Sequence, residues 1–403
     1  MSAKSAVSLW QLFVIFLRLG CTSFGGPVAH LAYFRHEFVE KRRWYSEQHY
    51  AQTVALCQFL PGPASSQVGI AIGMERGGYC GALLSWLGFT LPSALLLLAF
   101  AYVFVGVGDS VGYHWIAALK LVAVAVVAQA VWSMAKSLCP DKLRVAIALL
   151  TAISLLLLSG VVVQLLLMLI AALIGWRFIR AQAVMAEQAS AAAAKPTGVA
   201  PVLMFAVFAG LLVLLPALAA DSDSSMLKLF DHFYRAGALV FGGGHVVLPL
   251  LQAELVPAWV NQDAFLAGYG MAQAVPGPLF TLATYLGAVT PLPAWQGAFV
   301  ATLAIFLPAF LLLFAALPLW LQLSRQAGMR RAIAGINAAV VGILLAALYN
   351  PVFSSAVKHS YDMAGVVLAF VALAVWRWPP YLVVLLAALA GIARHYLHLF
   401  WGV

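Results

Sequence analysis

The sequence predicts an all-α polytopic membrane protein built from two homologous, inverted-topology repeats with broken or re-entrant helices. The first observation is composition, since 64% of the 403 residues are hydrophobic and 9% are charged, against about 25% charged in soluble domains. The second is that several apolar runs approach or exceed the roughly 20 residues that span a bilayer. These runs are 82–107, 116–135, 145–174, 199–220, 297–321 and 332–348. The third observation is an internal duplication.

The duplication is visible in three motifs that recur in the same order. Residues 17–31 (LRLGCTSFGGPVAHL) match residues 234–248 (YRAGALVFGGGHVVL) at six of fifteen positions. QFLPGP (58–63) recurs as QAVPGP (273–278), and FTLPSALLLL (89–98) recurs as IFLPAFLLLF (305–314). We predict a first repeat at 1–195, a linking transmembrane helix at 196–222 and a second repeat at 223–403.

The charges of equivalent loops predict that the two repeats have opposite orientations. Loop 33–48 carries four Lys or Arg residues, whereas its counterpart 250–263 carries none. The bias then reverses, because 105–115 has none and 323–331 has three arginines. Basic loops stay in the cytoplasm, so equivalent loops face opposite sides, as in many transporters. The same enrichment of Lys and Arg in cytoplasmic loops explains the net charge of +9, so this charge does not indicate nucleic-acid binding.

Each repeat is expected to contain the same elements in order. A helix runs up to Phe-Gly-Gly, and a short segment returns to a loop. A second helix begins near Ser46 or Asn261, both good N-caps, and runs into Pro-Gly-Pro. A short segment and four longer spans follow. Ten to thirteen spans are compatible with this pattern, since the short segments could be re-entrant or spanning.

The two Pro-Gly-Pro motifs predict broken helices. Proline lacks an N–H and clashes with the preceding turn, but it is favoured at the first helical position. Pro63 and Pro278 would each open a half-helix whose free N–H groups and positive end favour an anion. Such backbone is tolerated in a bilayer only inside protein or beside water. The predicted substrate-binding residues are Gln58, Pro61, Gly62, Pro63, Ser65 and Ser66, with Gln273, Pro276, Gly277, Pro278 and Thr281 in the second repeat.

The Phe-Gly-Gly motifs predict a second pair of substrate-binding segments. Glycine lets the backbone approach a ligand, although close helix crossing explains Gly-Gly equally well. Arg18 and Arg235 lie six residues before each Phe in apolar helices, where a charge is costly and usually functional; snorkelling is the alternative. The residues added here are Arg18, Phe24, Gly25, Gly26, Arg235, Phe241, Gly242 and Gly243.

Five other polar residues are candidates for ion coupling or electrostatic support. They are His30, Glu37, Lys120, His245 and Glu254. The histidines are more readily explained as polar residues near a cavity or interface, and Glu37 as an ion-pair partner of Arg35 and its neighbours. The four cysteines are scattered without a CxxC, so we expect no disulfide framework, metal or cofactor.

The balance of charge in the apolar segments favours an anionic substrate. Cationic and N–H donor groups outnumber acids there, and a bare dianion in a low-dielectric medium needs such compensation. The sequence has no G-x-x-x-x-G-K-[ST] motif for ATP. The driving force is therefore expected to be an ion gradient, the membrane potential or the substrate gradient, and the coupling ion stays open.

Four stretches resemble the chromate transporter family in its long, two-domain form. They are SFGGPVAHLAYFRHEFVEKRRW (23–44), QFLPGPASSQVGIAIG (58–73), FGGGHVVLPLL (241–251) and AQAVPGPLFTLATYLG (272–287). The resemblance implies a multi-pass protein of the bacterial inner membrane that exports chromate by secondary alternating access and confers chromate resistance. It implies chromate and lipid as partners, with a homodimer left open, and no enzymatic activity.

Three other functions remain open at this point. Sulfate or another tetrahedral oxyanion has the same charge and shape as chromate, so the motifs do not separate them. An anion channel would use the same broken helices. A membrane oxidoreductase that reduces chromate is a different class, against which the scattered cysteines and the lack of a cofactor motif count.

Overall fold

The computed structural model describes residues 8–107, 114–158, 160–179, 199–241, 244–319 and 326–401, and every regular element in these ranges is helical. This confirms the predicted all-α class. The elements before the linking segment are α1 (Leu9–Thr22), α2 (Gly26–Arg35), the π-helix η1 (His36–Lys41), α3 (Glu47–Phe59), α4 (Ala64–Val107), α5 (His114–Leu138), α6 (Lys142–Leu157) and α7 (Val161–Phe178).

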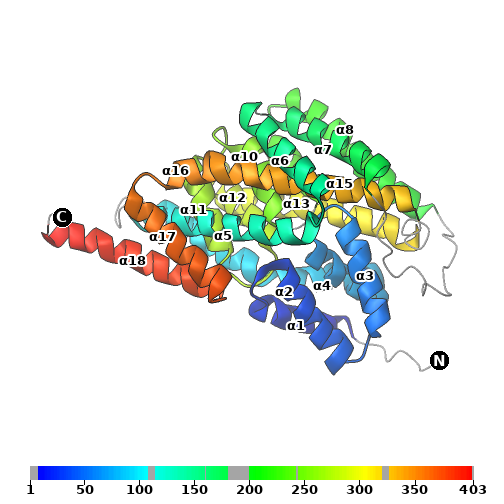
Figure 1. Cartoon of the computed structure of the whole chain (residues 1–403). Helices are drawn as coiled ribbons and strands as arrows, with labels where there is room; N and C mark the ends of the chain where they lie inside the picture. Colours follow the sequence, from blue (N-terminus) through cyan, green and yellow to red (C-terminus); the bar gives the residue numbers. More distant parts are fainter. Residues whose placement is uncertain are drawn as a thin grey trace.

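Along the chain, a single helix, α8 (Ala200–Ala220), connects the two sets of elements, and it lies at the upper right edge of the molecule in Figure 1. The second set is α9 (Ser225–Ala238), η3 (Gly244–Val246), α10 (Val247–Leu255), α11 (Gln262–Ala272), η4 (Leu279–Thr281), α12 (Leu282–Ala288), α13 (Ala294–Ala316), η5 (Leu317–Leu319), α15 (Ala327–Ala347), η6 (Leu348–Phe353), α16 (Ser354–Ala356), α17 (Ser360–Phe370), η7 (Val371–Val375) and α18 (Pro380–Trp401).

Five helices in the described ranges are long and apolar enough to cross a membrane, and several shorter apolar helices accompany them. The long segments are 64–106, 115–138, 200–220, 294–316 and 327–356. Only 17% of the most apolar window of α8 is buried, so most of this helix is available to lipid. The chain is therefore a multi-pass membrane protein, while the exact number of spans stays a prediction.

The first helix of each repeat crosses a long helix of the same repeat at a glycine. A Cβ added to Gly20 in α1 would lie 2.7 Å from the carbonyl oxygen of Phe89 in α4. A Cβ added to Gly237 in α9 would lie 2.2 Å from the carbonyl oxygen of Ile305 in α13. These positions are equivalent in the duplicated sequence. The same close helix crossing therefore occurs in both repeats.

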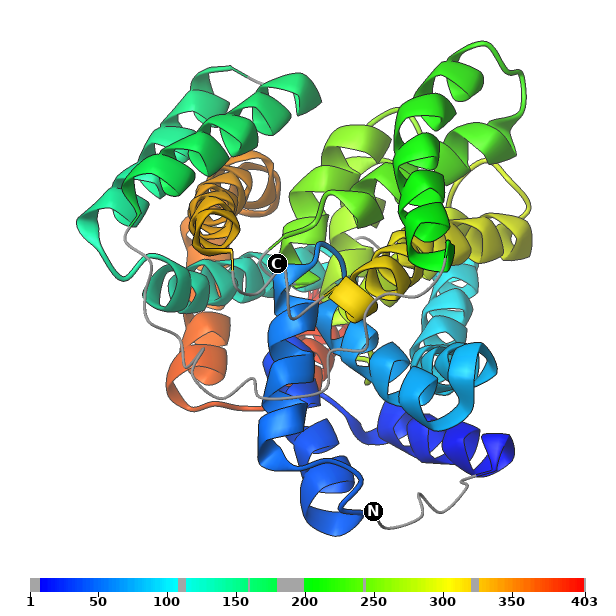
Figure 2. The same cartoon turned by 90° about the vertical axis from the view of Figure 1, so that its right-hand side faces the viewer.

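The last helices of each repeat pack against the other repeat. α15 lies along α6 and α7, whereas α5 lies along α17 and α18 (Figures 1 and 2). Small residues allow the first of these contacts, since a Cβ on Gly335 would lie 2.0 Å from the carbonyl oxygen of Ala171. This exchange buries apolar area between the repeats, which is a major source of stability.

Two apolar runs differ from their expected form. Run 145–174 is the hairpin of α6 and α7 rather than one span, because Gly160 turns the chain at φ +134°. Run 82–107 is the second part of α4, whose helical backbone is interrupted at Gly77 and Gly78. Glycine is needed at Gly78, where φ is +61° and ψ is −152°.

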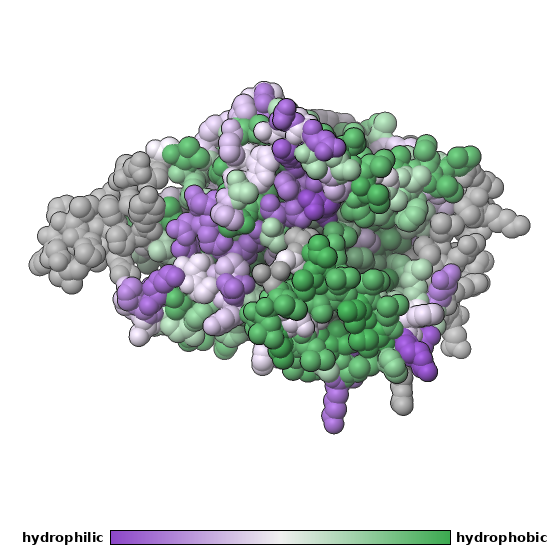
Figure 3. All heavy atoms as spheres, turned by 90° about the horizontal axis from the view of Figure 1, so that it is seen from above, coloured by the Kyte–Doolittle hydropathy of each residue, from purple (hydrophilic) through white to green (hydrophobic). Residues whose placement is uncertain are grey.

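Exposed apolar side chains cover the helices on the outside of the bundle. Figure 3 shows a broad apolar area on one face, next to a polar band. Leu150 of α6, Leu169 of α7 and Val213 of α8 are more than half exposed. An apolar surface of this kind marks contact with lipid or another protein.

Candidate functional site

The first Pro-Gly-Pro motif breaks the chain between two helices, as predicted. α3 ends at Phe59, Leu60 is extended, and α4 begins at Ala64 directly after Pro63. Gly62 adopts φ +115°, a conformation that L side chains rarely adopt. The Nε2 of Gln67 donates to the carbonyl oxygen of Pro61 at 2.9 Å. The break is therefore fixed partly by a side chain of the new helix.

Each Pro-Gly-Pro motif is bound by the residue before Phe-Gly-Gly in the other repeat. The N–H of Gly62 donates to the carbonyl oxygen of Val240 at 2.8 Å. The N–H of Gly277 donates to the carbonyl oxygen of Ser23 at 2.9 Å. The two bonds are equivalent: one runs from the Pro-Gly-Pro glycine of the first repeat to the second repeat, and the other runs from that of the second repeat to the first. The structure therefore brings the broken helices of both repeats together, although it uses these two N–H groups internally.

The prolines inside the long helices, Pro92 of α4 and Pro308 of α13, lie close to the same breaks, because the residue after each of them contacts a break of the other repeat. A Cβ on Gly277 would lie 2.8 Å from Oγ of Ser93, which follows Pro92 in α4. A Cβ on Gly62 would lie 3.5 Å from Cβ of Ala309, the residue equivalent to Ser93 in α13. All three recurring motifs of each repeat thus meet in one region between the repeats.

Four buried polar groups without partners lie on residues at or near the start of α4: three that can donate a hydrogen bond, and the amide oxygen of Gln67, which only accepts. His30 Nδ1 lies 3.3 Å from Oγ of Ser65 in the first turn, and the carbonyl of Ser23 lies beside the same ring. His30 Nε2 and the hydroxyls of Ser23 and Ser66 have no hydrogen-bond partner, although these residues are at most 2% exposed. Each such group costs about 1–3 kcal/mol unless a ligand or water satisfies it.

This arrangement can bind an anion. The helix that starts at Ala64 is long, and its N-terminal end carries roughly half a positive charge. If the Ser65 hydroxyl donates to Nδ1, a neutral His30 carries its proton on Nε2, where no protein group accepts it. The site would then offer an N–H and two hydroxyls beside free backbone N–H groups.

The second repeat does not reproduce this arrangement. Pro278 is followed by one 3-10 turn and the seven-residue helix α12, so it opens a shorter half-helix than expected. The Thr281 hydroxyl donates to the carbonyl oxygen of Pro278 at 2.6 Å, so it is occupied. His245 Nδ1 lies 2.8 Å from the Tyr269 hydroxyl. Pro276 is buried, as is the rest of the motif.

The two glutamines before the breaks have different environments. Gln58 is exposed and lines a cavity of ≈ 420 Å³ between α2 and α3. This cavity also contacts Arg35 and Glu47, beside the basic loop. Gln273 is partly covered, and its Nε2 is buried without a partner. The glutamine before the first break is therefore accessible from the basic-loop side, although Gly62 and Pro63 are buried like the second motif.

The helix that leads into the second motif, α11, is more deeply buried than its counterpart α3. Eight of its eleven residues are buried, compared with four of thirteen in the equivalent α3. A Cβ on Gly270 would lie 2.8 Å from the carbonyl oxygen of Leu119 in α5. Lys120 Nζ of α5 pairs with Oδ1 of Asp263 at 2.7 Å. In the described ranges α3 makes no comparable contact with α15.

The first Phe-Gly-Gly motif needs its glycines for backbone reasons. Gly25 and Gly26 have φ +98° and +78°, and Gly25 caps the start of α2. Phe24 packs against Tyr381, with ring centroids 4.8 Å apart. In the second repeat Phe241 is half-buried, while the predictions for Gly242 and Gly243 lie outside the described residues.

The two arginines have different environments. Arg18 is exposed on α1, and no contact in the described part of the chain joins its side chain to the breaks. Arg235 pairs with Glu254 at 2.8 Å and with Asp231 at 2.9 Å. Their predicted roles in binding the substrate stay predictions.

Glu37 forms ion pairs with its neighbours, though not with Arg35. Its carboxylate pairs with Lys41 at 3.1 Å and with Arg42 at 2.7 Å, whereas Arg35 pairs with Glu40 and Glu47. Burial alone raises the pKa of the Glu37 carboxyl, but the hydrogen bonds from Arg42 and Lys41 outweigh it and lower the pKa overall.

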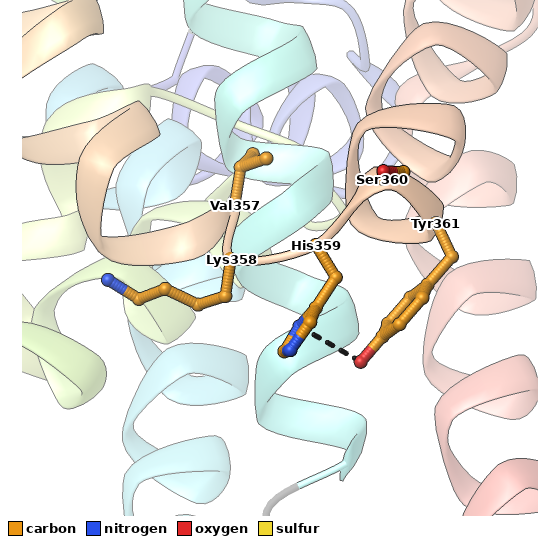
Figure 4. A pocket seen from close by; sticks show the side chains of 5 residues that line it. All are labelled: Val357, Lys358, His359, Ser360 and Tyr361. Atoms are coloured by element: carbon orange, nitrogen blue, oxygen red, sulfur yellow. Dashed lines mark hydrogen bonds between the residues drawn. The ribbon is translucent and has the colours of Figure 1, made fainter.

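A second hollow, of ≈ 550 Å³, lies at a single surface loop far along the chain from these motifs. Residues 357–361 line it, and Figure 4 shows His359 turned toward Tyr361, whose hydroxyl lies 3.0 Å from Nδ1. This hollow brings no distant segments together. Within the described ranges there is no group of three His, Cys, Asp or Glu residues that could hold a metal.

Sequence reasoning missed several residues of this region. Ser23 and Ser93 flank recurring motifs, so alignment of the repeats could have pointed to them. Asp231, His232 and Asp263 have no matching residue in the first repeat, so the duplication gave no indication of them.

Comparison with known proteins identifies the family. A family model described as chromate transporter matches residues 10–176 and 227–392. A chromate transport protein from Cupriavidus metallidurans is 30% identical over 91% of this chain and 87% of its own. One from Pseudomonas aeruginosa is 29% identical over 74% and 70%. A probable chromate transport protein from Synechococcus elongatus is 26% identical over 98% and 97%.

No solved structure matches the chain. The two matched regions contain the two sets of equivalent helices, and they lie on either side of α8. No enzyme family is indicated. The chain belongs to the chromate transporter family.

Proposed function

We propose that this protein exports chromate from the cytoplasm across the bacterial inner membrane, as a secondary transporter that confers chromate resistance. Relatives over most of the chain are named chromate transport proteins. The observation that carries the assignment of the site is the set of unpartnered buried groups at the start of α4. Chromate is a tetrahedral dianion, and such donors around a positive helix end suit it.

The position of the cavity fits loading of the substrate from the cytoplasm, which export requires. The cavity that reaches Gln58 opens beside the basic loop of Lys41 and Arg42, which the positive-inside rule assigns to the cytoplasm. In the second repeat the equivalent helix, α11, is packed into the protein against α5. Alternating access would exchange these two arrangements, with α3 closing as α11 opens.

The proposed binding residues are His30, Ser23, Ser65 and Ser66, with Gln58 at the entrance. An unpaired hydroxyl that bonds a charged ligand contributes about 1.5–3 kcal/mol, which is roughly tenfold or more in affinity. Ser66→Ala should therefore weaken chromate binding by about that factor. Ser85→Ala is the matched control, because Ser85 is equally buried in α4 but its hydroxyl already donates to Ala82.

The experiment is uptake of radiolabelled chromate into everted membrane vesicles, which corresponds to export from cells. Parallel samples contain excess sulfate or a collapsed proton gradient. Saturable uptake that sulfate barely reduces, with a raised KM in Ser66→Ala alone, would support the proposal. Equal losses in Ser66→Ala and Ser85→Ala would indicate packing rather than binding.

Sulfate or another tetrahedral oxyanion is the second candidate substrate. The donors at α4 do not distinguish tetrahedral dianions by charge or shape. Labelled sulfate taken up as fast as chromate would favour this candidate. Uptake that does not saturate would favour an anion channel over a carrier.

A further inference from the structure

Four titratable or charged side chains form a compact cluster between α9 and α10, which we call the α9–α10 quartet. Glu254 on α10 accepts hydrogen bonds from both terminal nitrogens of Arg235 at 2.8 Å and lies 2.7 Å from Nδ1 of His232. Arg235 also pairs with Asp231 at 2.9 Å. Within the quartet, Arg235 lies 3.2 Å from the His232 ring.

The quartet is largely removed from water. The side chains of Asp231 and Glu254 are 5% and 9% exposed, and those of His232 and Arg235 are 21% and 23% exposed. The indole of Trp259 covers His232, with ring centroids 5.8 Å apart. An uncompensated charge here is therefore costly.

The formal charges of the quartet do not cancel by themselves. Two carboxylates and one guanidinium leave one negative charge when His232 is neutral. One bound proton, on the imidazole or a carboxyl, makes the sum zero. A low-dielectric environment favours the neutral sum. The 2.7 Å contact between Nδ1 of His232 and Glu254 lets these two groups share that proton, while Arg235 stays charged.

Few other charges can compensate the quartet. α8 and α13, which pack on α9, contain no charged residue. The other titratable or charged groups on the packed elements are Lys228 and Tyr234 of α9, His245 of η3, Arg177 of α7, and Arg330 and Arg331 of α15. The Tyr234 hydroxyl donates to the carbonyl oxygen of Phe208, and none of the charged groups forms an ion pair with the quartet in the described ranges.

The quartet is connected to the candidate site through one helical turn. The carbonyl oxygen of Arg235 accepts the N–H of Leu239 at 3.1 Å. The next residue, Val240, accepts the N–H of Gly62 in the first broken helix. α9 and α10 also flank the second Phe-Gly-Gly segment. A change of charge between these helices would therefore act directly on the segment that binds the first break.

The quartet is confined to the second repeat. The residues equivalent to Asp231 and His232 are Val14 and Ile15, which cannot titrate. Arg18, equivalent to Arg235, is exposed, and Glu37, equivalent to Glu254, pairs with Lys41 and Arg42. A symmetric structural requirement of the fold would have kept the cluster in both repeats.

We propose that the α9–α10 quartet is a proton-binding site whose proton is coupled to movement of the transported anion. Loss of the proton leaves a buried negative charge between α9 and α10 and favours their separation. Binding of the proton favours the closed arrangement seen here. This inference rests on the proposed function, and it names the proton as the coupling ion.

The test uses purified protein in liposomes that contain a pH-sensitive dye. One measurement is chromate-dependent proton movement, and the other is exchange of labelled for unlabelled chromate at equal concentrations. Exchange requires the binding site and alternating access but no net proton flux. Glu254→Gln makes the quartet neutral without a proton, so we expect it to retain exchange and lose proton movement at least tenfold. Glu37→Gln, at the equivalent position, is the matched control and should retain both.

Each outcome has a consequence. Proton movement at the wild-type level in Glu254→Gln would overturn the proposal. Loss of exchange in both Glu254→Gln and Asp231→Asn would assign the quartet to structure alone and overturn it as well. Wild-type protein that exchanges chromate without moving protons would reject the coupling site but keep the proposed function. Wild-type protein that exchanges no chromate would reject the proposed function itself.

Discussion

Gly277→Ala should be the most damaging single substitution of a glycine at the breaks. Gly277 has φ +97°, and an L side chain in a left-handed conformation costs about 1–2 kcal/mol. The added Cβ would also lie 2.8 Å from Oγ of Ser93 and 3.2 Å from the carbonyl oxygen of Phe89. Overpacking of this kind costs about 1–3 kcal/mol, so the total loss is about 2–5 kcal/mol.

Two other glycines separate these contributions. Gly26 has φ +78°, and a Cβ there meets nothing within 4 Å, so Gly26→Ala should cost only the conformational part. Gly62 has φ +115° with its closest contact at 3.2 Å, to the flexible side chain of Gln67, so Gly62→Ala should lie between. Ser93→Ala removes the atom at 2.8 Å and should restore about 1 kcal/mol to Gly277→Ala.

The assay is the unfolding midpoint of each purified variant in the same detergent, together with chromate uptake in vesicles. The expected order of stability is Gly26→Ala above Gly62→Ala above Gly277→Ala. Uptake should fall most in Gly277→Ala, because its N–H binds the Ser23 carbonyl beside His30. The reasoning would be refuted if Gly277→Ala and Gly26→Ala had equal midpoints, or if Ser93→Ala restored nothing.

Three further predictions concern groups outside the breaks. Asp263→Asn leaves the mostly buried Lys120 unpaired and should weaken the packing of α11 on α5. A Gln273→Cys thiol, in a background free of native cysteines, should then react faster with an impermeant thiol reagent added outside. An unchanged rate of reaction would contradict this. Glu37→Gln should lower stability by about 1–2 kcal/mol at pH 7. Because the pKa of Glu37 is lowered in the folded protein, that difference disappears as the pH falls below the ordinary glutamate pKa of about 4.3 and through the lower folded pKa. Unfolding at several pH values would detect this. Asn261→Ala removes an N-cap that accepts the N–H of Ala264 at 2.8 Å and should lower the free energy of unfolding by about 1 kcal/mol, which denaturant unfolding would measure. An unchanged free energy would show that α11 is held by packing alone.

The local features of the fold could be predicted from the sequence because they depend on short-range chemistry. Ser46 accepts the N–H of His49 at 3.1 Å and Asn261 that of Ala264, so both N-caps are confirmed. The break after Leu60 is confirmed as well, because proline restricts the chain in any environment. These features need no knowledge of distant contacts.

The exchange of helices between repeats and the inner face of the site could not be predicted in this way. Whether α6 and α7 pack on α15 or on α5 depends on small residues such as Gly175, Gly335 and Gly342, which meet other backbones. Glycine in an apolar helix does not by itself indicate its partner. The role of Ser23 depends on a hydrogen bond across about 250 residues of sequence, which a single sequence does not reveal.

The difference between the repeats is the feature most directly tied to transport. Duplicated sequences predict equivalent elements, yet α11 is buried against α5 while α3 borders a cavity. Because α3 and α11 are equivalent helices in different environments, other parts of the protein must stabilise the arrangement in which α11 is the buried one. The ion pair of Lys120 with Asp263 has no counterpart between the equivalent positions of the other repeat. The α9–α10 quartet is complete only in the second repeat, because Asp231 and His232 are replaced by Val14 and Ile15 in the first. In the alternating-access cycle that we propose, these groups, which lack sequence symmetry, stabilise the closed arrangement of the second repeat. Their release is then the step that lets the first repeat close in its place.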